Sequence, residues 1–530
     1  MELSQLIAEL SQPAAYPHTV PPIEVRQTHI SVVFLAGSFV YKIKKPVDLG
    51  FLDFSSLEKR HHFCQEEVRL NRRLAPEVYL DVVPVTADPS GVRFEGRGDA
   101  IEWAVKMQRL PDDANMESRM DHGQLDISTV ADLAARIAAF HAAAEGGERI
   151  AAFGRFDVVA GNARENLEQV APHVGATISR PVLDRLRSLV EGSLEQNREL
   201  IEARADAGIP RDTHGDLRLD HVYLLPDRAP PADVIVIDCI EFNERFRFAD
   251  PVADMAFLVM GFLGRGRGDL ARTFADAYFR SRGDEAGRAL LPFYVSYRAA
   301  VRGKVESVKL VEPEIPQAER DAALTRARGL WLLALSALEQ PGRRPALVLV
   351  GGLPGSGKST LSADLAREAG FTIIRSDVVR KELAGAMATG AGAAGFEQGI
   401  YSPSWTERVY AECLRRAGEL LFAGGRVIVD ASFGNDRRRQ AFLEAANRLG
   451  VPGVFLVCRA SGDTIRDRLA ARRGDASDAN WEIHLRAAEK WQEPGPMARA
   501  ALREISTAGS RQEALDRALE ALRDVQLLDR

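Results

Sequence analysis

The chain is poor in cysteine, and this scarcity excludes two common ways of stabilising a protein. Its four cysteines, Cys64, Cys239, Cys413 and Cys458, are spread over 530 residues and form no CxxC pair. A disulfide framework or a structural zinc site needs paired or closely spaced cysteines. We therefore expect neither, and we expect the reducing surroundings of a cytoplasmic protein.

The sequence also lacks a long hydrophobic run and an excess of positive charge. Its most apolar stretch, 255–262, is bounded by Asp254 and Arg265, whereas a membrane helix needs about 20 apolar residues. The N-terminus carries Glu2 and Glu9 and no basic segment, unlike a secretory signal. With 69 Lys and Arg against 75 Asp and Glu, the formal charge is −6. We expect no membrane partner, and general binding of nucleic acid is disfavoured.

The composition is that of a globular protein with several domains. Apolar residues make up 46% of the chain and charged residues 27%, both near the averages of globular proteins. This length corresponds to about three or four folding units. Pro341, Gly342 and Pro345 separate a helical stretch from a new apolar strand. We therefore predict a boundary near residue 340, with domains 1–340 and 341–530.

A phosphate-binding motif opens the second of these domains. Its segment GLPGSGKS fits G-x-x-x-x-G-K-[ST] and lies between an apolar strand and a helix. In this motif the glycines let main-chain amides surround phosphate oxygens, the lysine adds a cation, and the serine hydroxyl binds Mg²⁺. A glycine-rich helix entry without a ligand is the alternative. The predicted nucleotide-binding residues are Gly352, Gly355, Ser356, Gly357, Lys358, Ser359 and Thr360.

Two carboxylates follow strands of the same domain. Asp430 ends the apolar strand RVIVD, from where a carboxylate can hold Mg²⁺ through water, so we predict Asp430 and Ser359 as metal ligands. Asp377 follows FTIIRS, where an acidic residue can orient an acceptor hydroxyl or take its proton. We predict that Asp377 is catalytic. The alternative is that it caps the following helix.

An arginine-rich segment follows the next strand. Arg466, Arg468, Arg472 and Arg473 crowd this region, and a mobile lid of arginines can cover transferring phosphates. We predict that Arg472 and Arg473 contact the nucleotide, with a solvated helix as the alternative. Together with GGLPGSGKST, RSDVVRKEL and VIVDASF, this segment makes 345–500 resemble AAA-type P-loop kinases such as polynucleotide kinase, gluconate kinase and zeta toxin. The resemblance implies a parallel sheet flanked by helices.

A second candidate phosphoryl-transfer centre lies in the first domain. The triplet HGD ends at Asp216, His221 follows five residues later, and Asp238 ends the strand VIVID. A carboxylate on a loop can orient an acceptor hydroxyl, while two further ligands hold Mg²⁺ against the nucleotide. This region resembles the catalytic core of the aminoglycoside phosphotransferases, relatives of the protein kinases. The resemblance implies that Asp216 is the catalytic base and that Asp238 and His221 hold the metal.

Upstream residues fit the same resemblance. FVYKIKK is similar to the strand whose lysine contacts the nucleotide phosphates, with Lys42 at the matching position and Lys44 as the second choice. Glu67 in the following helix is the implied ion-pair partner, with Glu66 as the rival. His221 departs from the pattern, because the family has asparagine there and imidazole is a poorer ligand for Mg²⁺. Either Asp220 or water compensates, or the metal preference shifts, or this half is catalytically weak.

A basic helix in the first domain bears on the acceptor. Arg298 and Arg302 are four residues apart, hence on one helix face, and Lys304 is nearby. If this face lines a cleft it favours an anionic acceptor, and a solvated basic helix is the alternative.

Over most of its length the chain is similar to bacterial fusions of a phosphotransferase-like domain with a P-loop kinase domain. The resemblance implies a multidomain protein of α/β and α+β classes. Its two-lobed, protein-kinase-like half has an N-lobe of about 1–110 and a C-lobe of about 111–340. We expect an ATP- and Mg²⁺-dependent phosphotransferase with two nucleotide sites and a small or sugar-like acceptor, such as a phosphorylated metabolite.

Two other functions stay open. One is a polynucleotide 5′-hydroxyl kinase in the C-terminal half, suggested by the arginine-rich segment and Arg437–Arg439, with the N-terminal half as a binding or regulatory module. The other is a pseudokinase scaffold, suggested by His221.

Overall fold

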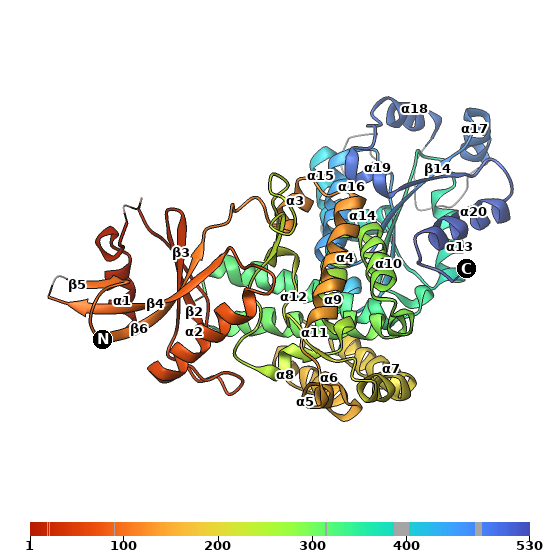
Figure 1. The fold of residues 1–530 in the computed structure, drawn as a ribbon. Coiled ribbons are helices and arrows are strands. Elements are labelled where there is room, and N and C mark those ends of the chain that lie inside the picture. The colour runs from red at the N-terminus through yellow and green to blue at the C-terminus, as the bar shows by residue number, and fades with distance from the viewer. Residues whose placement is uncertain are drawn as a thin grey trace. The chain divides into compact units, whose positions relative to one another are not determined.

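A computed structural model describes residues 1–18, 20, 22–89, 91–312, 315–385, 402–471 and 480–529 (Figure 1). By the contacts between its residues, the chain divides into two compact units. The first unit comprises 1–160, 197–261 and 269–291, and the second comprises 161–196, 262–268 and 292–530. The boundary near residue 340 stays a prediction.

The first unit begins with an antiparallel sheet in the strand order β1-β2-β3-β6-β4-β5. Phe34, Tyr41 and Val85 bury one face of this sheet. Helix α2 lies against β4 and β6, where Cys64 and Val68 pack into a second apolar cluster. The elements are α1 (Leu3–Leu10), β1 (Glu24–Gln27), β2 (Ser31–Ala36), β3 (Phe39–Lys44), α2 (Leu57–Asn71), β4 (Tyr79–Asp88), β5 (Gly91–Phe94) and β6 (Ala100–Gln108).

Residues 116–338 are mostly helical, with short strands between the helices. The most apolar run of the sequence falls in α9 (Pro251–Gly264), in which 251–260 are all buried. Among the described residues, no helix is both long and apolar enough to cross a membrane. The other helices are α3 (Met116–Asp121), α4 (Ile127–Ala143), α5 (Glu148–Ala151), α6 (Phe156–Glu168), α7 (Arg180–Asp206), α8 (Glu244–Arg247), α10 (Gly268–Arg282), α11 (Leu291–Val308) and α12 (Gln317–Leu338). The short strands are β7 (Arg211–Asp212), β8 (Val222–Leu224), β9 (Val234–Val236) and β10 (Phe248–Ala249).

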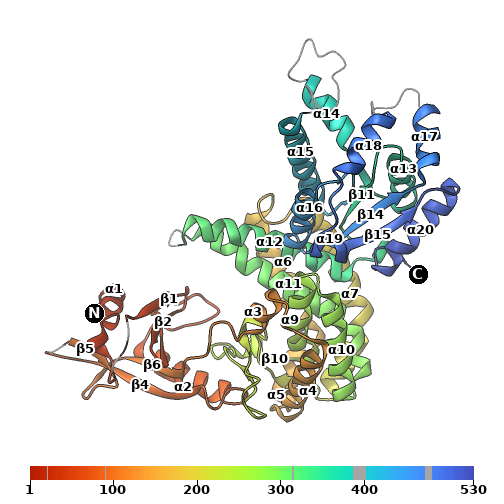
Figure 2. The ribbon, with the colours of Figure 1, turned by 90° about the horizontal axis from the view of Figure 1, so that it is seen from above.

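The second unit contains a parallel sheet in the order β12-β13-β11-β14-β15, flanked by helices (Figure 2). The parallel sheet flanked by helices is confirmed. The strands are β11 (Ala346–Gly351), β12 (Thr372–Arg375), β13 (Arg426–Asp430), β14 (Gly453–Arg459) and β15 (Leu502–Ser506). The helices that follow α12 are α13 (Lys358–Ala369), α14 (Ser376–Gly385), α15 (Pro403–Phe422), α16 (Asp436–Arg448), α17 (Gly462–Ala471), α18 (Trp481–Glu489), α19 (Pro496–Ala501) and α20 (Arg511–Asp524).

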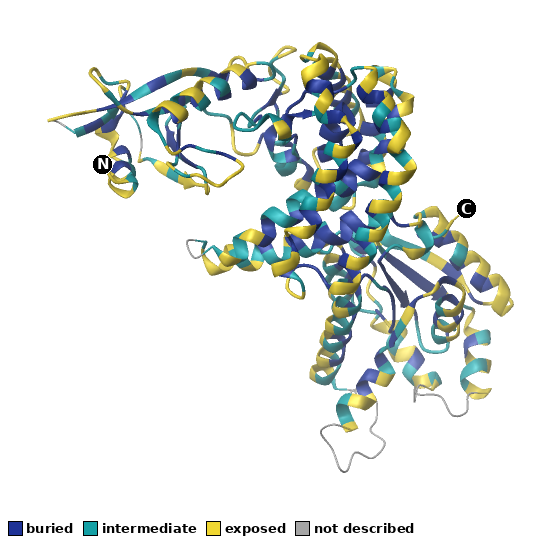
Figure 3. Ribbon diagram, turned by 90° about the horizontal axis from the view of Figure 1, so that it is seen from below, coloured by how far each residue is buried: buried dark blue, intermediate teal, exposed yellow. Residues whose placement is uncertain are grey.

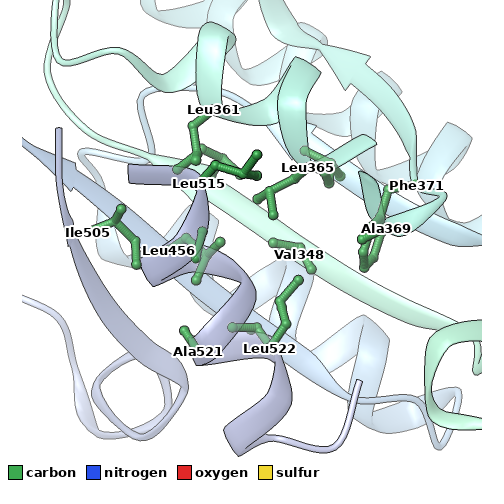
Figure 4. Close-up of a cluster of buried hydrophobic side chains, with 14 of the residues drawn as sticks. Val348, Leu361, Leu365, Ala369, Phe371, Leu456, Ile505, Leu515, Ala521 and Leu522 are labelled. Atoms are coloured by element: carbon green, nitrogen blue, oxygen red, sulfur yellow. The ribbon is translucent and has the colours of Figure 1, made fainter. Parts of the chain in front are cut away.

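The central strands read as continuous apolar runs because helices cover both faces of the sheet. Every residue of β11 and β13 is buried, and the outer faces of the helices are exposed (Figure 3). On one face, Leu361 and Leu365 of α13 and Leu522 of α20 pack with Val348 and Leu456 of the sheet (Figure 4). This packing fixes the carboxyl ends of the strands, where the predicted site residues lie.

Helix α12 packs directly against the part of the second unit that carries the phosphate-binding motif, residues 341–530, which we call the P-loop part. A β-carbon at Gly329 would come within 2.6 Å of the Arg448 carbonyl, so only glycine allows this approach. The Arg328 guanidinium lies 4.7 Å from the centre of the Phe422 ring. Residues upstream of the predicted boundary therefore contribute to the packing of the P-loop part.

Candidate active sites

The phosphate loop connects β11 to α13, in the setting that the motif needs. Gly352, Gly355 and Gly357 have φ angles of 137°, 82° and 87°, which cost glycine little and other residues much more. Lys358 is the first residue of α13, and its Nζ donates to the Leu353 carbonyl at 2.9 Å. Backbone conformation therefore gives the loop its curled shape, and the lysine lies along it.

A cavity of about 480 Å³ opens over this loop. Its lining comes from the loop, helices α13, α14, α15, α17 and α20, the end of β13 with the residues that follow it, and the segment after β15. Gly352 and Ser356 belong to the same loop, outside this lining. The predicted residues that line the cavity are Gly355, Gly357, Lys358, Ser359, Thr360, Asp377 and Asp430.

Asp430 ends β13 and is buried beside the phosphate loop. Burial raises the pKa of this carboxyl group, while the charge of Lys358 and a hydrogen bond with Ser359 act in the opposite direction. Arg375 Nε lies 3.6 Å from Asp430 Oδ2. A carboxylate beside a serine hydroxyl offers hard oxygen ligands of the kind that Mg²⁺ prefers. The residues at this point therefore fit a magnesium ion.

The hydroxyl group of Ser356 shows what the loop itself can accommodate. Ser356 is 1% exposed, and within the described part of the chain its Oγ has no hydrogen-bond partner. A buried hydroxyl without a partner is costly, and a phosphate oxygen would satisfy it. The loop therefore fits a bound phosphate group.

Asp377 lies in the first turn of α14, which begins at Ser376. It is thus inside the helix rather than before it. Arg380 follows one turn later, is buried, and donates from Nη1 to Thr406 Oγ1 at 3.3 Å. Asp377, Arg380 and Thr406 all line the cavity. This wall therefore presents a carboxylate, a guanidinium group and a hydroxyl.

The arginines predicted to cover the nucleotide are only partly within the described chain. Arg472 and Arg473 lie outside the described residues. Arg466 lies over the Trp481 ring at 4.6 Å, and Arg468 Nη2 donates to the Thr507 carbonyl at 2.6 Å. These two arginines therefore contact groups of the protein itself.

Two of the three arginines behind the polynucleotide alternative also have partners in the protein. Arg438 pairs with Glu407 at 2.7 Å. Arg439 is fully buried, where it donates to the carbonyl groups of Phe433 and Gln492. This arginine run is therefore not an open basic surface.

In the first unit, Lys42 of β3 reaches two carboxylates. Its Nζ lies 2.8 Å from Glu67 Oε1 and 2.8 Å from Asp238 Oδ1. Lys44 Nζ lies 2.7 Å from Glu67 Oε2 and also pairs with Glu241. The structure thus brings Lys42, Glu67 and Asp238 together and places Lys44 between two acids.

Charge interactions outweigh burial in setting the pKa values of Lys42 and Asp238. Burial by itself would raise the pKa of Asp238, but Lys42 and His221 hold it well below its usual range. Burial would lower the pKa of Lys42, but Asp238 and Glu67 raise it well above the ordinary value. Both groups are therefore ionised at neutral pH. The rival Glu66 instead pairs with Arg69 at 2.7 Å.

Asp216 and His221 lie close to Asp238. His221 Nδ1 lies 2.9 Å from the Asp216 carbonyl and 3.8 Å from Asp216 Oδ2. His221 Nε2 lies 3.8 Å from Asp238 Oδ2. Arg218 Nε lies 3.7 Å from Asp216 Oδ2, and Arg218 also binds Asp220 through Nε at 3.0 Å. Asp220 therefore faces an arginine here.

The predicted metal ligands of the first unit, His221 and Asp238, form a pair rather than a cage. Among the described residues, no group of three or more His, Cys, Asp or Glu side chains is arranged to hold a metal. Mg²⁺ is usually bound by one or two protein carboxylates, with water and phosphate oxygens as its other ligands. Asp238 therefore fits a magnesium ion that arrives with a nucleotide.

A buried group supports the loop that carries Asp216. Asp254 Oδ2 accepts from the His214 amide at 3.0 Å, and its Oδ1 accepts from the Gly215 amide at 2.8 Å. His141 Nε2 lies 3.0 Å from Asp254 Oδ2, and His141 Nδ1 lies 2.7 Å from the Tyr278 hydroxyl. The buried side chains of His141 and Asp254 thus support the same loop.

Comparison with known proteins identifies the relatives of this chain. Residues 347–494 match the family model of an AAA domain. The uncharacterized protein Rv2004c of Mycobacterium tuberculosis is 34% identical over 506 residues, which cover 95% of this chain and 96% of the relative. The uncharacterized protein Mb2027c of Mycobacterium bovis matches over the same length with the same identity. The chain belongs to this protein family. Residues 347–494 are thus an AAA domain, in agreement with the predicted AAA-type P-loop fold. The kinase activity and the fusion with a phosphotransferase-like half stay predictions.

Two solved structures with partial likeness are described as kinases. A gluconokinase from Sinorhizobium meliloti matches 35% of this chain and 95% of its own, with 20% identity and a TM-score of 0.27. A choline/ethanolamine kinase family protein from Mesorhizobium loti matches 63% of this chain and 97% of its own, with 14% identity and a TM-score of 0.35. Scores this low carry no conclusion about this chain.

Several residues at these sites escape sequence reasoning. Glu241 pairs with Lys44, and the Tyr79 hydroxyl accepts from the Asp238 amide at 3.1 Å. The only signal for Glu241 is a charge in the apolar run VIVIDCIEF. Tyr79 carries no such signal, because its partner lies far away in the sequence.

Proposed function

We propose that the chain is an ATP-dependent phosphotransferase with two nucleotide sites. Each site would transfer the γ-phosphate to a hydroxyl of a small or sugar-like acceptor. The observation that carries the proposal is the cavity over the phosphate loop, which Lys358, Ser359, Asp377 and Asp430 line together. The AAA domain match over 347–494 supports it independently.

In the P-loop site the residues divide by chemistry. Lys358 supplies a cation to the phosphates, and Ser359 and Asp430 would hold Mg²⁺. The metal, when bound, would neutralise charge that develops on the transferred group. Asp377 lines the same cavity, and we propose that its carboxylate orients the acceptor hydroxyl and takes its proton.

The acceptor of this site would carry an anionic group. Arg380 lies one turn from Asp377 on α14 and lines the same cavity. A guanidinium group favours a phosphate or carboxylate on the acceptor. The basic helix that first suggested an anionic acceptor supplies little support, because Arg302 pairs with Glu306 at 3.5 Å and Lys304 with Asn166 at 2.7 Å.

The first unit would carry the other site, with a two-lobed kinase-like arrangement. Lys42, held by Glu67, would contact the nucleotide phosphates, and Asp238 and His221 would hold the metal. Asp216 would orient the acceptor hydroxyl. The support is the convergence of these side chains, with Lys42 Nζ 2.8 Å from Asp238 Oδ1 and His221 Nε2 3.8 Å from Asp238 Oδ2.

Transfer of label from γ-labelled ATP tests the proposal. The full chain is incubated with Mg²⁺ and matched neutral and anionic acceptors, such as glucose with gluconate and glycerol with glycerate. A 5′-hydroxyl oligonucleotide is included for the polynucleotide alternative. Lys358→Ala should abolish transfer by the P-loop site, and Asp216→Ala transfer by the other. Arg380→Met should reduce transfer to anionic acceptors far more than Arg380→Lys does. Transfer to the oligonucleotide alone would contradict the small-acceptor assignment.

A further inference from the structure

Two carbonyl groups of the phosphate loop accept hydrogen bonds from side chains far along the sequence. The Pro354 carbonyl lies 2.9 Å from Nδ1 of His484 in α18. The Ser356 carbonyl accepts from Thr507 Oγ1, just after β15, at 2.7 Å. A carbonyl oxygen can only accept, so Nδ1 of His484 carries the hydrogen. Both donors are buried.

These two bonds bear on the amides that follow each carbonyl. In a trans peptide unit, the C=O and the next N–H point in opposite directions. A donor that fixes the Pro354 carbonyl therefore turns the Gly355 amide the other way, and a donor on the Ser356 carbonyl does the same for the Gly357 amide. Gly355 and Gly357 both line the cavity. Each bond thus fixes the orientation of a peptide unit whose amide hydrogen belongs to a residue of the cavity lining.

Helix α17 supports both donors. Arg466 lies over the Trp481 ring at 4.6 Å, and Trp481 stacks on the His484 ring with centroids 4.9 Å apart. Arg468 Nη2 donates to the Thr507 carbonyl at 2.6 Å. Arg466 and Arg468 are two residues apart, so they point to different sides of the helix. Each can therefore contact a separate element. One helix therefore holds both carbonyl donors in place.

The same helix packs against the loop at a glycine. A β-carbon on Gly355 would come within 2.8 Å of Ile465 Cγ2 and 3.0 Å of Leu469 Cγ. The absence of a side chain at Gly355 thus lets α17 approach the phosphate loop closely. Helix α17 therefore contacts the phosphate loop directly and also supports the two residues that donate to its carbonyl groups.

We infer that His484 and Thr507 are positioning residues of the phosphate loop, and that Arg466 and Arg468 act on the loop through them. The inference rests on the proposed function, because it assumes that the loop binds nucleotide phosphates. It assigns α17 a part in phosphate binding that does not require its arginines to touch the nucleotide.

Matched substitutions separate the hydrogen bonds from packing. Thr507→Val removes the hydroxyl and keeps the shape, whereas Thr507→Ser keeps the hydroxyl. His484→Leu removes the donor, whereas His484→Asn places an amide N–H near the position of Nδ1. Calorimetry of the full chain with Mg²⁺ measures the affinity for ADP in the binding event that Lys358→Ala abolishes. Ligand-observed NMR measures the affinity for adenosine, which serves as the control because it lacks the phosphates.

A net hydrogen bond is worth about 3- to 10-fold in affinity, so Thr507→Val and His484→Leu should each weaken ADP binding by about that factor. Thr507→Ser and His484→Asn should recover most of it, and adenosine binding should not change. Equal losses of ADP affinity in Thr507→Val and Thr507→Ser, and in His484→Leu and His484→Asn, would overturn the inference. Equal losses of affinity for ADP and for adenosine would also overturn it. If one substitution prevents folding, the other pair decides. If Lys358→Ala abolishes no ADP binding, the proposed function fails, and the inference falls with it.

Discussion

Lys44 Nζ lies 2.7 Å from Glu67 Oε2, and both side chains are 1% exposed. The other oxygen of the same carboxylate faces Lys42 at 2.8 Å. Glu67 therefore serves two lysines of one strand, and Glu241 completes the charge balance of Lys44. The arrangement separates the two candidates, because Lys42 also faces Asp238 whereas Lys44 is enclosed by Glu67 and Glu241.

Lys44→Met should destabilise the first unit strongly. The substitution leaves the buried carboxylates of Glu67 and Glu241 short of a cation, and breaking a buried pair in this way costs about 3–5 kcal/mol. Thermal unfolding of the full chain, followed in the transition of the first unit, measures the effect. Lys59→Met is the matched control, because Lys59 pairs with Asp53 at an exposed position and exposed pairs contribute about 0–1 kcal/mol. Equal losses in both variants would contradict this account of Lys44.

The stability of the first unit should fall as the pH drops from about 6.5 to about 4. Burial lowers the pKa of His214 from 6.5 to about 4. The folded state then binds fewer protons than the unfolded state, so stability is fully present above pH 6.5 and is lost in acid, by about 3 kcal/mol. His214→Gln keeps a donor for the Ile237 carbonyl, now 2.9 Å from Nε2, and does not titrate. Its melting temperature should depend less on pH over this range, and an unchanged dependence would exclude His214 as the source.

Gly329→Ala should destabilise the second unit although alanine favours helices. A β-carbon there meets the Arg448 carbonyl at 2.6 Å, and overpacking costs about 1–3 kcal/mol. Gly192→Ala in α7 is the control, because nothing lies within 4 Å of its β-carbon, and it should stabilise by up to about 1 kcal/mol. Chemical denaturation compares the two variants. Stabilisation by both would show that α12 does not pack closely on the P-loop part.

His141→Leu should reduce turnover at the proposed site of the first unit by about tenfold or more, because loss of positioning is costly in catalysis. Asp254 would lose a hydrogen bond while it holds the amides of His214 and Gly215. ATP hydrolysis in a Lys358→Ala background isolates this site. His141→Gln can still donate to Asp254 from a position near Nε2 and should retain most of the rate, with ATP affinity unchanged in both variants. A parallel loss of rate in both would refute the positioning role.

The P-loop part could be predicted from sequence because its features are local. The glycines, Lys358 and Ser359 form one contiguous motif, and the buried parallel strands read as apolar runs. The placement of Asp430 follows from the end of a strand. In the first unit, spacing and resemblance led to Lys42, Glu67 and Asp238, which the structure brings together.

The rest depended on contacts across long stretches of sequence. No local pattern shows that Arg439 is buried under Trp491, or that Glu67 rather than Glu66 faces β3. Glu66 and Glu67 are adjacent in one helix, so only the packing of α2 on the sheet decides which one points inward. His484 and Thr507 likewise meet the phosphate loop from more than 100 residues away.

The number of nucleotides bound per chain tests the central claim most directly. Calorimetry with Mg²⁺ and a non-hydrolysable ATP analogue should give two sites for the unaltered chain. It should give one for Lys358→Ala, one for Asp238→Asn, and none for the double variant. A single site that Asp238→Asn leaves intact would contradict the claim for the first unit. Two sites retained in Lys358→Ala would contradict it for the second.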